Sequence, residues 1–361
     1  MKKKYVHCVL IIAIICSGFA FANAVAEESG TAIEMRSFTD SLGREIMIPE
    51  KLDKVAVSGP LAQMVLFAIC PDNLVGVATE WEPSAEEYLD SKYYDLPLIG
   101  QFYGGKGQLN LETLLSSGAQ VVIDVGEPKK SAKDDLDALQ KQTGIPFVHI
   151  TGTLTTMGDA YLMLGELLQM QRKAEELSQY CNDTCSMIGK IASEVEKTRI
   201  LYITGPKGLN VIARGSYHAE VIDMLSDNIA LLDNPSSKGT GNEVDMEQIL
   251  KWNPDVVIFS PDSIFDTVAD DVLWSNVNAI MNDRYYEIPF GPYNWIGFPP
   301  SVQRYLGMMW MARLLYPDNA GFDLYHEVER YFNLFYHCDV SRVQFDELVS
   351  NSIGRCGGVN E

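Results

Sequence analysis

The sequence predicts an α/β fold: two related lobes, each with a central, mainly parallel sheet covered by helices, joined by a long helix. Three observations lead to this prediction. Short apolar runs alternate with stretches of helical spacing, as in strand–helix–strand units. One helix–strand motif occurs twice, with its glutamates at positions 112 and 247, an offset of 135 residues. A proline-free stretch of helical spacing lies between the two copies.

The first half of the chain begins with a predicted hairpin at residues 38–46, with Gly43 in the turn. Strands are predicted at 55–58, 74–78, 121–125 and 147–150, and helices at 61–69, 111–117 and 131–143. Apolar strands separated by helical segments favour a parallel sheet that is covered on both faces.

The same alternation starts again in the second half. Strands are predicted at 200–204, 210–213, 256–260 and 285–288, and helices at 217–225, 246–252 and 300–315.

The repeated motif spans residues 109–123 and residues 244–258. Each copy reads apolar, polar, apolar, Glu, any residue, apolar, Leu, followed by a turn and a β-branched strand. One copy lies in each half, so the halves are predicted to be related lobes. Glu112 and Glu247 each open a helix, where the helix dipole favours a carboxylate, and this alone could explain either glutamate.

Residues 155–197 are predicted to form the helical connector. They contain no proline, and their apolar residues recur at helical spacing. An unbroken helix would be about 60 Å long, although a break near residues 170–172 also fits the sequence. The absence of a Gly/Ser-rich tether predicts a stiff connection with little room for large lobe motions.

The first 26 residues have the plan of a secretory signal. Three lysines precede an apolar run, and small residues precede a cut after Ala24 or after Ala26, of which we favour Ala26. A retained membrane anchor is the alternative, because the run is near the minimum spanning length. The predicted organisation is a signal peptide at 1–26, an N-terminal lobe at 27–154, a connector at 155–197, a C-terminal lobe at 198–318 and an extension at 319–361. The extension is expected to pack as a helix on the second lobe.

The charge balance excludes a generic nucleic-acid partner. The chain has 49 acidic and 28 basic residues, a net charge of −21, whereas nucleic-acid binding needs a basic surface. Removal of the signal and its three lysines leaves 25 basic residues and a net charge of −24. We expect an exported protein that is periplasmic or extracytoplasmic, soluble and monomeric, with a surface suited to a basic partner.

The cysteines do not predict a disulfide scaffold. Five of the seven lie beyond the signal: Cys70, Cys181, Cys185, Cys338 and Cys356. Five is an odd number and too few for such a scaffold. Cys181 and Cys185 are four residues apart, but no histidine lies near them, so we expect a structural role rather than a metal site. The pairing stays open, and a bond between Cys338 and Cys356 is one that would staple the tail.

Taken together, these features resemble the substrate-binding proteins of ABC importers for iron-siderophores, haem and cobalamin. The resemblance covers about residues 37–317 and rests on residues 40–44, 55–58, 74–77, 110–123, 200–202, 245–258 and the region of Trp295. It implies a non-enzymatic protein that holds a metal chelate between two lobes and delivers it to a permease and its ATPase, with no resident cofactor or metal. By motif, it implies that Glu112 and Glu247 pair with arginines of the permease.

Loops at the carboxyl ends of the strands are the expected ligand site, as in other open α/β sheets. These loops contain residues 58–60, 80–81, 102–106, 127, 214–218 and 293–295. The candidate ligand-binding residues are Trp81, Tyr103, Arg214, Tyr217, His218, Tyr293, Asn294 and Trp295. Aromatic rings suit a large chelate, and Arg214, His218 and Lys106 could meet negative charge on it. Tyr103 and Trp295 fall close to positions where cobalamin-binding relatives carry an aromatic residue, and Trp81 lies near another.

Two other functions remain open at this point. The same scaffold could bind a tetrahedral oxyanion such as molybdate or tungstate through Arg214, Ser216, Tyr217 and backbone N–H groups. A bare metal ion is disfavoured because the chain has only five histidines. A secreted α/β hydrolase is the weakest alternative, since neither a Gly-x-Ser-x-Gly nor a His-Glu-x-x-His motif occurs.

Overall fold

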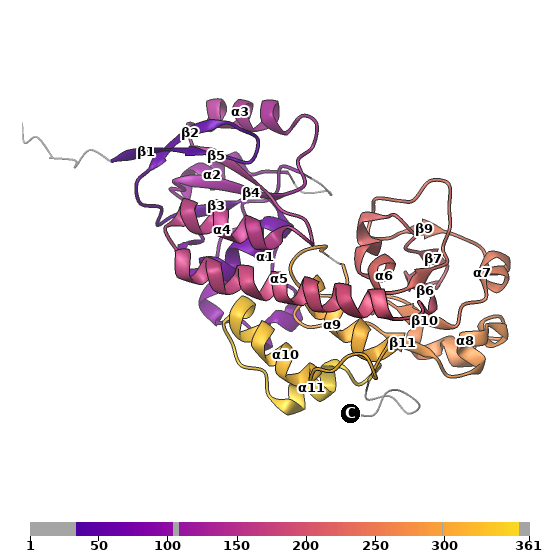
Figure 1. Ribbon diagram of the computed structural model, residues 1–361. Coiled ribbons are helices and arrows are strands. Elements are labelled where there is room, and N and C mark those ends of the chain that lie inside the picture. The colour runs from indigo at the N-terminus through magenta and orange to yellow at the C-terminus, as the bar shows by residue number, and fades with distance from the viewer. Residues whose placement is uncertain (1–33, 104–107, 298, 354–361) are drawn as a thin grey trace, which may run out of the picture. The chain divides into compact units, whose positions relative to one another are not determined.

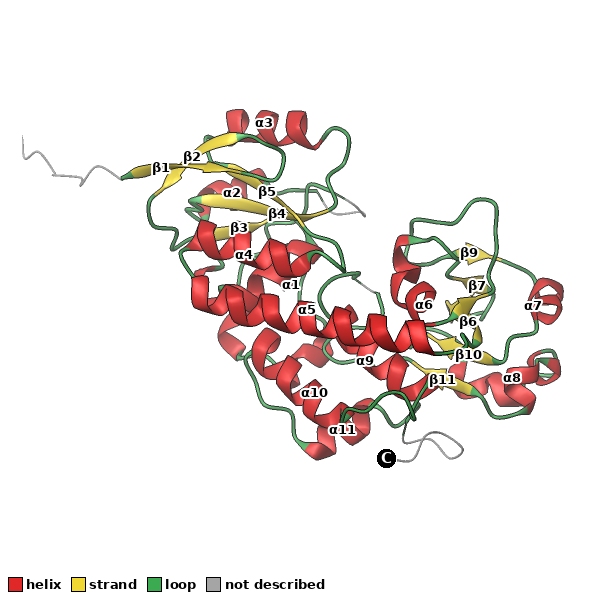
Figure 2. Cartoon of the chain, in the orientation of Figure 1, coloured by secondary structure: helices red, strands yellow, loops and turns green. Residues whose placement is uncertain are grey.

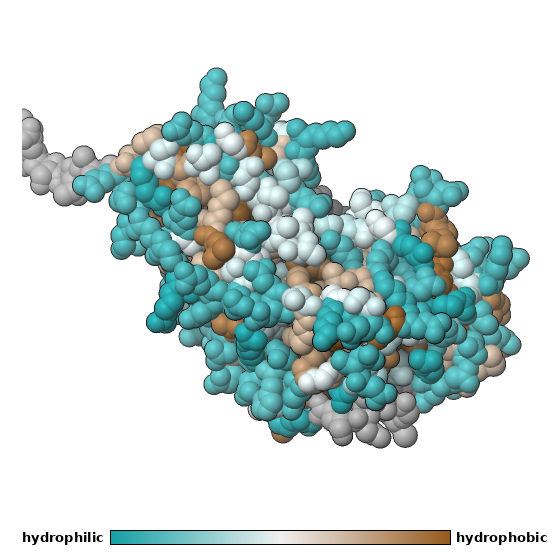
Figure 3. Space-filling model, viewed as in Figure 1, coloured by the Kyte–Doolittle hydropathy of each residue, from teal (hydrophilic) through white to brown (hydrophobic). Residues whose placement is uncertain are grey.

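The fold is described from a computed structural model, which covers residues 34–103, 108–297 and 299–353. The predicted signal peptide, Lys106 and Cys356 lie outside these residues. From Glu34 onward the described residues belong to one compact unit. In these ranges no helix has the length and apolar character needed to cross a membrane. Hydrophilic residues cover most of the face seen in Figure 3.

The first half contains a hairpin and a three-stranded parallel sheet. The hairpin pairs β1 (Met35–Thr39) with β2 (Glu45–Pro49), and Gly43 adopts a φ of 70° in its turn, as predicted. The sheet has the order β3 (Val55–Val57), β4 (Val121–Gly126), β5 (Phe147–Thr151). The helices of this half are α1 (Pro60–Ile69), α2 (Leu111–Ser116) and α3 (Ala132–Thr143). Short 3₁₀ turns cover Pro71–Asn73, Pro83–Glu87 and Ser91–Tyr93.

The predicted strand at residues 74–78 is wrong. The Val75 amide donates to the carbonyl of Val55, but the Val77 amide donates to the carbonyl of Pro97. The segment therefore changes its partner within two residues, so it forms isolated bridges and no continuous ladder.

The second half contains a mixed sheet of six strands. Five strands follow one another in the order β11 (Tyr285–Glu287), β10 (Val256–Phe259), β6 (Arg199–Thr204), β7 (Asn210–Val211) and β9 (Asn242–Glu243). The sixth strand, β8 (Asp227–Asn228), also pairs with β6. The strands β11, β10, β6 and β8 run parallel, and β7 and β9 pair antiparallel. The helices are α6 (Glu220–Leu225), α7 (Met246–Trp252), α8 (Asn278–Met281) and α9 (Arg304–Leu315), with 3₁₀ turns at Tyr217–Ala219, Phe265–Asp270 and Trp274–Asn276. Figure 2 shows the strands in two separate groups with helices packed around them.

The two copies of the repeated motif have the same local structure. In each copy a short capped helix, α2 or α7, precedes the central strand of a parallel trio, β4 or β10. The side chain of Asn110 accepts a hydrogen bond from the Thr113 amide (3.1 Å), and that of Asp245 accepts one from the Gln248 amide (2.8 Å). These caps satisfy amides that the first turn leaves free, which explains the polar residue two positions before each glutamate.

The connector is two helices, α4 (Met157–Leu168) and α5 (Gln171–Glu194). They are separated by the predicted break, where Gln169 adopts a left-handed φ of 56°. The helices pack closely because α4 carries two glycines at the contact: a Cβ atom on Gly158 would collide with Asn182, and one on Gly165 with Ala174. At 1.5 Å per residue, α5 is about 36 Å long, and beyond α4 it contacts α1 of the first half and α6 and α9 of the second (Figure 1).

The C-terminal extension contains α10 (Leu324–Tyr331), a π-helical turn (Phe332–Tyr336) and α11 (Arg342–Leu348). It packs as helices on α9 of the second half, as expected, but it also contacts the first half and the connector. The ring of Phe332 meets that of Tyr88 in the first half, and the ring of Phe335 meets those of Tyr161 and Tyr180 in the connector. The amide of Glu287 in β11 donates to the carbonyl of Asn351. The aromatic residues of the extension therefore complete a core that is shared by α1, α5 and α9, and the extension contacts both halves.

Candidate functional site

Three polar side chains form a row across the sheet of the first half, at the carboxyl ends of its strands. Ser58 follows β3, Asp124 lies in β4, and His149 lies in β5 directly beside Asp124 in the strand register. The Ser58 hydroxyl donates to Asp124 Oδ1 (2.6 Å), and His149 Nδ1 lies 2.7 Å from Asp124 Oδ2. Because an ionised carboxylate only accepts hydrogen bonds, His149 Nδ1 carries the proton in this contact.

This row does not form a hydrolytic triad. Nucleophilic catalysis needs a serine that donates to an imidazole, which the carboxylate orients from the other side. Here Ser58 donates to the carboxylate instead. The Nε2 atom of His149 is buried and has no hydrogen-bond partner among the described residues. The row therefore holds Asp124 in place and gives Ser58 no general base.

Asp124 lines a cavity of about 470 Å³, which we call the central cavity. Its lining residues are Ser58, Gly59, Pro60, Leu61, Ala62, Tyr103, Asp124, Val125, Gly126, Glu127, Lys129, Tyr217 and Ser237. The first eleven come from the first half: from the end of β3 into α1, from the loop that contains Tyr103, and from the end of β4 and the loop after it. The last two come from the second half. The cavity thus lies at the carboxyl ends of parallel strands, where open α/β sheets commonly bind ligands.

One wall of the central cavity is the ring of Tyr103. Its hydroxyl donates to Asp135 Oδ2 (2.8 Å), and Lys129 Nζ lies 4.1 Å from the ring centroid. Burial, together with the hydrogen bond to Asp135, raises the pKa of Tyr103. The phenol is therefore neutral, and the lysine rests on an aromatic face beside the cavity.

Tyr217 lines the central cavity from the second half. The guanidinium of Arg304 lies 5.2 Å from the centroid of the Tyr217 ring and forms a largely buried ion pair with Glu220. Burial raises the pKa of Tyr217 above its ordinary value. This packing fixes the ring of Tyr217, so the cavity has one supported aromatic wall from each half.

Of the eight predicted ligand-binding residues, Tyr103 and Tyr217 line the central cavity, and the other six do not. Trp81 and Tyr293 are buried with their ring centroids 6.5 Å apart, and Trp81 Nε1 donates to the carbonyl of Tyr93 (3.0 Å). Arg214 donates to the Asn228 carbonyl (2.7 Å) and forms an ion pair with Asp227. These contacts hold the three side chains against the protein itself.

The aromatic loop before α9 is also packed inward. Trp295 is fully buried, and its Nε1 donates to the carbonyl of Gly291. Asn294 Oδ1 accepts from the amides of Ile296 (2.9 Å) and Gly297 (3.2 Å). His218 Nδ1 lies 2.8 Å from the carbonyl of Gly297, and burial lowers the pKa of this histidine. The loop therefore supports the wall formed by Tyr217 from behind.

The sequence reasoning missed Asp124, His149, Lys129 and Ser237. A signal for the first two was present: each is a polar residue inside an otherwise apolar predicted strand. A side chain that interrupts a buried strand needs a hydrogen-bond partner, and parallel neighbours in register supply one. Nothing in the sequence marks Lys129 or Ser237, which lie in exposed loops.

Glu112 and Glu247 are exposed on the first turns of α2 and α7. Within the described ranges neither glutamate forms an ion pair. Glu247 also lines a shallow cavity of about 380 Å³ with Asp245, Gln248 and Lys251. Both carboxylates are accordingly free to meet a partner.

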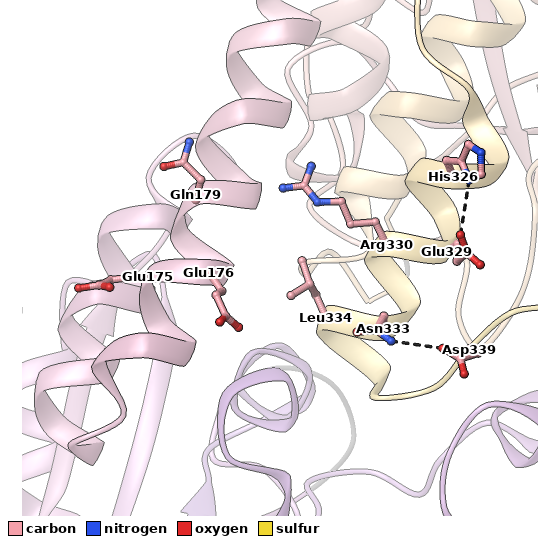
Figure 4. A pocket seen from close by; sticks show the side chains of 9 residues that line it. All are labelled: Glu175, Glu176, Gln179, His326, Glu329, Arg330, Asn333, Leu334 and Asp339. Carbon is pink, nitrogen blue, oxygen red and sulfur yellow. Dashed lines mark hydrogen bonds and ion pairs between the residues drawn. The ribbon is translucent and has the colours of Figure 1, made fainter.

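A larger cavity, of about 730 Å³, lies between α5 and the C-terminal extension (Figure 4). Four of its nine lining residues are acidic: Glu175, Glu176, Glu329 and Asp339. Figure 4 shows Arg330 pointing across it from α10, and this guanidinium also lies 4.9 Å from the ring centroid of Tyr180. None of the predicted site residues lines this cavity.

The described cysteines, Cys70, Cys181, Cys185 and Cys338, are free thiols. Burial raises the pKa of the Cys70 thiol to about 12, so this thiol stays protonated and packs as an apolar group. In the described part of the chain, no group of three His, Cys, Asp or Glu side chains is arranged to hold a metal ion.

Comparison with known proteins agrees with this architecture. The sequence pattern of the family described as "Periplasmic binding protein" matches residues 62–292. No curated protein sequence matches the chain. An ABC transporter solute-binding protein from Sulfurospirillum deleyianum DSM 6946 superposes with a TM-score of 0.78 at 23% identity, over 87% of this chain and 98% of that protein. A periplasmic solute-binding protein from Veillonella parvula DSM 2008 superposes with a TM-score of 0.72 at 25% identity, over 89% and 98%.

The molybdate-binding protein MolA of Haemophilus influenzae, solved with molybdate, has the same fold. Its TM-score is 0.65 at 19% identity, over 85% of this chain and 99% of MolA. Each of these proteins matches over nearly its whole length. The family pattern covers more than half of the chain, and so this protein belongs to the periplasmic binding protein family.

Proposed function

We propose that this protein is the solute-binding component of an ABC import system and that it captures a metal chelate of the ferric siderophore, haem or cobalamin type. The observation that carries the proposal is the central cavity, which takes its walls from both halves of the chain at the carboxyl ends of parallel strands. In this proposal the protein is exported after cleavage near Ala26, acts as a monomer, and delivers its ligand to a membrane permease and its ATPase.

The size and lining of the central cavity support a chelate as ligand. Its volume of about 470 Å³ is in the range of small-molecule sites, of roughly 300–1,000 Å³, and far exceeds that of a single tetrahedral anion. Tyr103 and Tyr217 add an aromatic residue to the lining from each half of the chain. No protein ligand for a metal is needed in this proposal, because the chelator supplies the coordination.

An oxyanion is the second candidate, supported by the shared fold with MolA bound to molybdate. Two of the groups that we expected to hold such an anion are already engaged: Arg214 pairs with Asp227, and Ser216 donates to the carbonyl of Ser236 (2.8 Å). Among the described residues that line the central cavity, two carboxylates, Asp124 and Glu127, stand against one ammonium, that of Lys129. This charge balance favours a chelate over a dianion.

The test is a thermal-shift experiment on the chain from Glu27 onward with ferric siderophores, haem, cobalamin, molybdate and tungstate. A ligand at 100 times its Kd stabilises the folded state by about 2.7 kcal/mol, which raises the Tm by several degrees. We expect such a shift with at least one chelate. Tyr103→Ala and Tyr217→Ala should abolish it, and Tyr325→Ala, a half-buried aromatic residue of the extension, should not. A shift with molybdate or tungstate alone would contradict the proposal.

A further inference from the structure

We propose that Asp124 determines the ligand specificity of the central cavity: its carboxylate receives a hydrogen-bond donor or a positively charged group of the ligand and disfavours anionic ligands. This inference rests on the proposed function and names the chemistry that the captured chelate must present.

The position of Asp124 is set by the sheet. Parallel register places it beside His149, and Ser58 follows the neighbouring strand on its other side. The two hydrogen bonds, of 2.6 and 2.7 Å, hold one carboxylate oxygen each. His149 is itself anchored, because its amide donates to Asp40 Oδ2 and its carbonyl accepts from the Ser41 amide. The carboxylate is therefore preorganised before any ligand enters.

In the described ranges no lysine or arginine compensates the charge of Asp124 with an ion pair. Its two hydrogen-bond partners are the neutral hydroxyl of Ser58 and the imidazole of His149. Lys129 lies over the ring of Tyr103 rather than on this carboxylate. A carboxylate with this surrounding attracts a cation and repels an anion.

A ligand that enters the central cavity must supply a hydrogen-bond donor to Asp124. The side chain of Asp124 is only 11% exposed, and the central cavity is where this exposed part meets solvent. A ligand that fills the cavity displaces the water there. A carboxylate that loses water without gaining a donor is strongly destabilised, whereas one that gains a charge-assisted hydrogen bond is not. The ligand must therefore bring a donor to this point, such as an ammonium, an amide N–H or a hydroxyl group.

The experiment changes the charge of one chelate without changing its metal centre. The probes are ferrioxamine B, a ferric trihydroxamate with a free ammonium group, and the same chelate with its amine acetylated or succinylated. Haem, cobalamin and molybdate are measured alongside, all by calorimetric titration. We expect the affinity of the wild-type protein to fall from the ammonium form to the acetylated form and again to the succinylated form. Asp124→Asn should weaken binding of the ammonium form about tenfold to a hundredfold. The three charge forms should then bind this variant with nearly equal affinity.

Glu127→Gln is the matched control, because it removes the same charge from an exposed lining residue and should change the order much less. Ser58→Ala keeps the carboxylate but removes one of its hydrogen bonds, so the order should persist with weaker binding. A melting curve without ligand shows whether Asp124→Asn is folded. If it is not, Ser58→Ala still tests the role of the carboxylate.

Two outcomes would overturn the role of Asp124 but leave the proposed function standing. One is that the succinylated chelate or haem binds most tightly, and the other is that Asp124→Asn lowers the affinity for all three charge forms equally. Binding of molybdate alone, or of no probe, would overturn the proposed function as well.

Discussion

Asp40 and Arg44 show how a short motif becomes a buried ion pair. Both side chains are almost fully buried, and their charged groups lie 2.9 Å apart. Asp40 also accepts hydrogen bonds from the amides of Leu42, Arg44 and His149, and Arg44 reaches the carbonyl of Phe147. The pair therefore joins the hairpin to β5, directly behind the row that holds Asp124.

Asp40→Asn should lower the free energy of unfolding by about 3–5 kcal/mol, because it removes the buried partner of Arg44 and leaves its buried guanidinium only the exposed carboxylate of Asp137. Asp137→Asn is the control. Asp137 also pairs with Arg44, at 3.0 Å, but its side chain is 58% exposed, so its loss should cost about 1 kcal/mol or less. Urea unfolding curves measure both. Equal losses in the two variants would show that burial does not set the contribution of this pair.

At the level of single residues, the sequence predicted only part of the lining of the central cavity. It marked Tyr103 and Tyr217, and the structure places both in the central cavity. It marked Trp81 and Trp295 equally, but both indole N–H groups donate to backbone carbonyls inside the protein. Aromatic residues serve cores and ligand sites alike, so the residue type alone could not separate these two uses.

The duplicated helix–strand unit explains why two glutamates are equivalent. Asn110 and Asp245 cap α2 and α7, which leaves Glu112 and Glu247 at the same exposed position of each first turn. The caps already satisfy a free amide of each turn, so neither glutamate is needed as a cap. This freedom supports the proposed pairing with basic residues of the permease.

The double variant Glu112→Ala, Glu247→Ala should weaken coupling to the permease while leaving ligand binding unchanged. Exposed ion pairs contribute about 0–1 kcal/mol each, so docking should weaken by up to about thirtyfold. The measurement is ATP hydrolysis by the reconstituted transporter, titrated with the loaded protein. Glu86→Ala, Glu196→Ala removes one exposed acid from each half as a control. Unchanged stimulation in the first double variant would exclude the docking role.

Elements were predicted best where the hydrophobic pattern is local. The alternation of strands and helices, the repeat and the break in the connector could all be read from periodicity and turn residues. The segment at 74–78 and the packing of the extension could not, because both depend on partners that are distant in the sequence. Four of the residues 331–336 are aromatic, which the sequence alone shows, but only the tertiary structure shows which surface they cover.

Across the whole molecule, the extension connects segments from both halves, and His337 is one of its contacts. Its Nε2 lies 3.0 Å from the carbonyl of Phe67 in α1, and burial lowers the pKa of this histidine below its ordinary 6.5. The folded protein therefore keeps His337 neutral at a pH where the unfolded chain binds a proton. More protons in the unfolded state mean that stability falls as the pH falls below about 6.5.

Urea unfolding between about pH 5.5 and 7.5 should thus show decreasing stability toward acid, with a smaller pH dependence in His337→Gln. Glutamine retains an N–H donor for the Phe67 carbonyl but does not titrate. His326→Gln replaces an exposed histidine of the same extension and should leave the pH dependence nearly unchanged. If His337→Gln has the wild-type slope, this contact does not contribute to the loss of stability in acid.

The sequence by itself determined the α/β class, the repeated helix–strand unit and the helical connector, because each depends on periodicity within a single segment. The tertiary structure decided which side chains meet. Asp124 and His149 are 25 residues apart and become neighbours only through strand register, while Tyr103 and Tyr217 face one cavity only because two halves pack together. The lining of this cavity depends on contacts between residues that are distant in the sequence, and the hydrophobic pattern of a single segment does not predict such contacts.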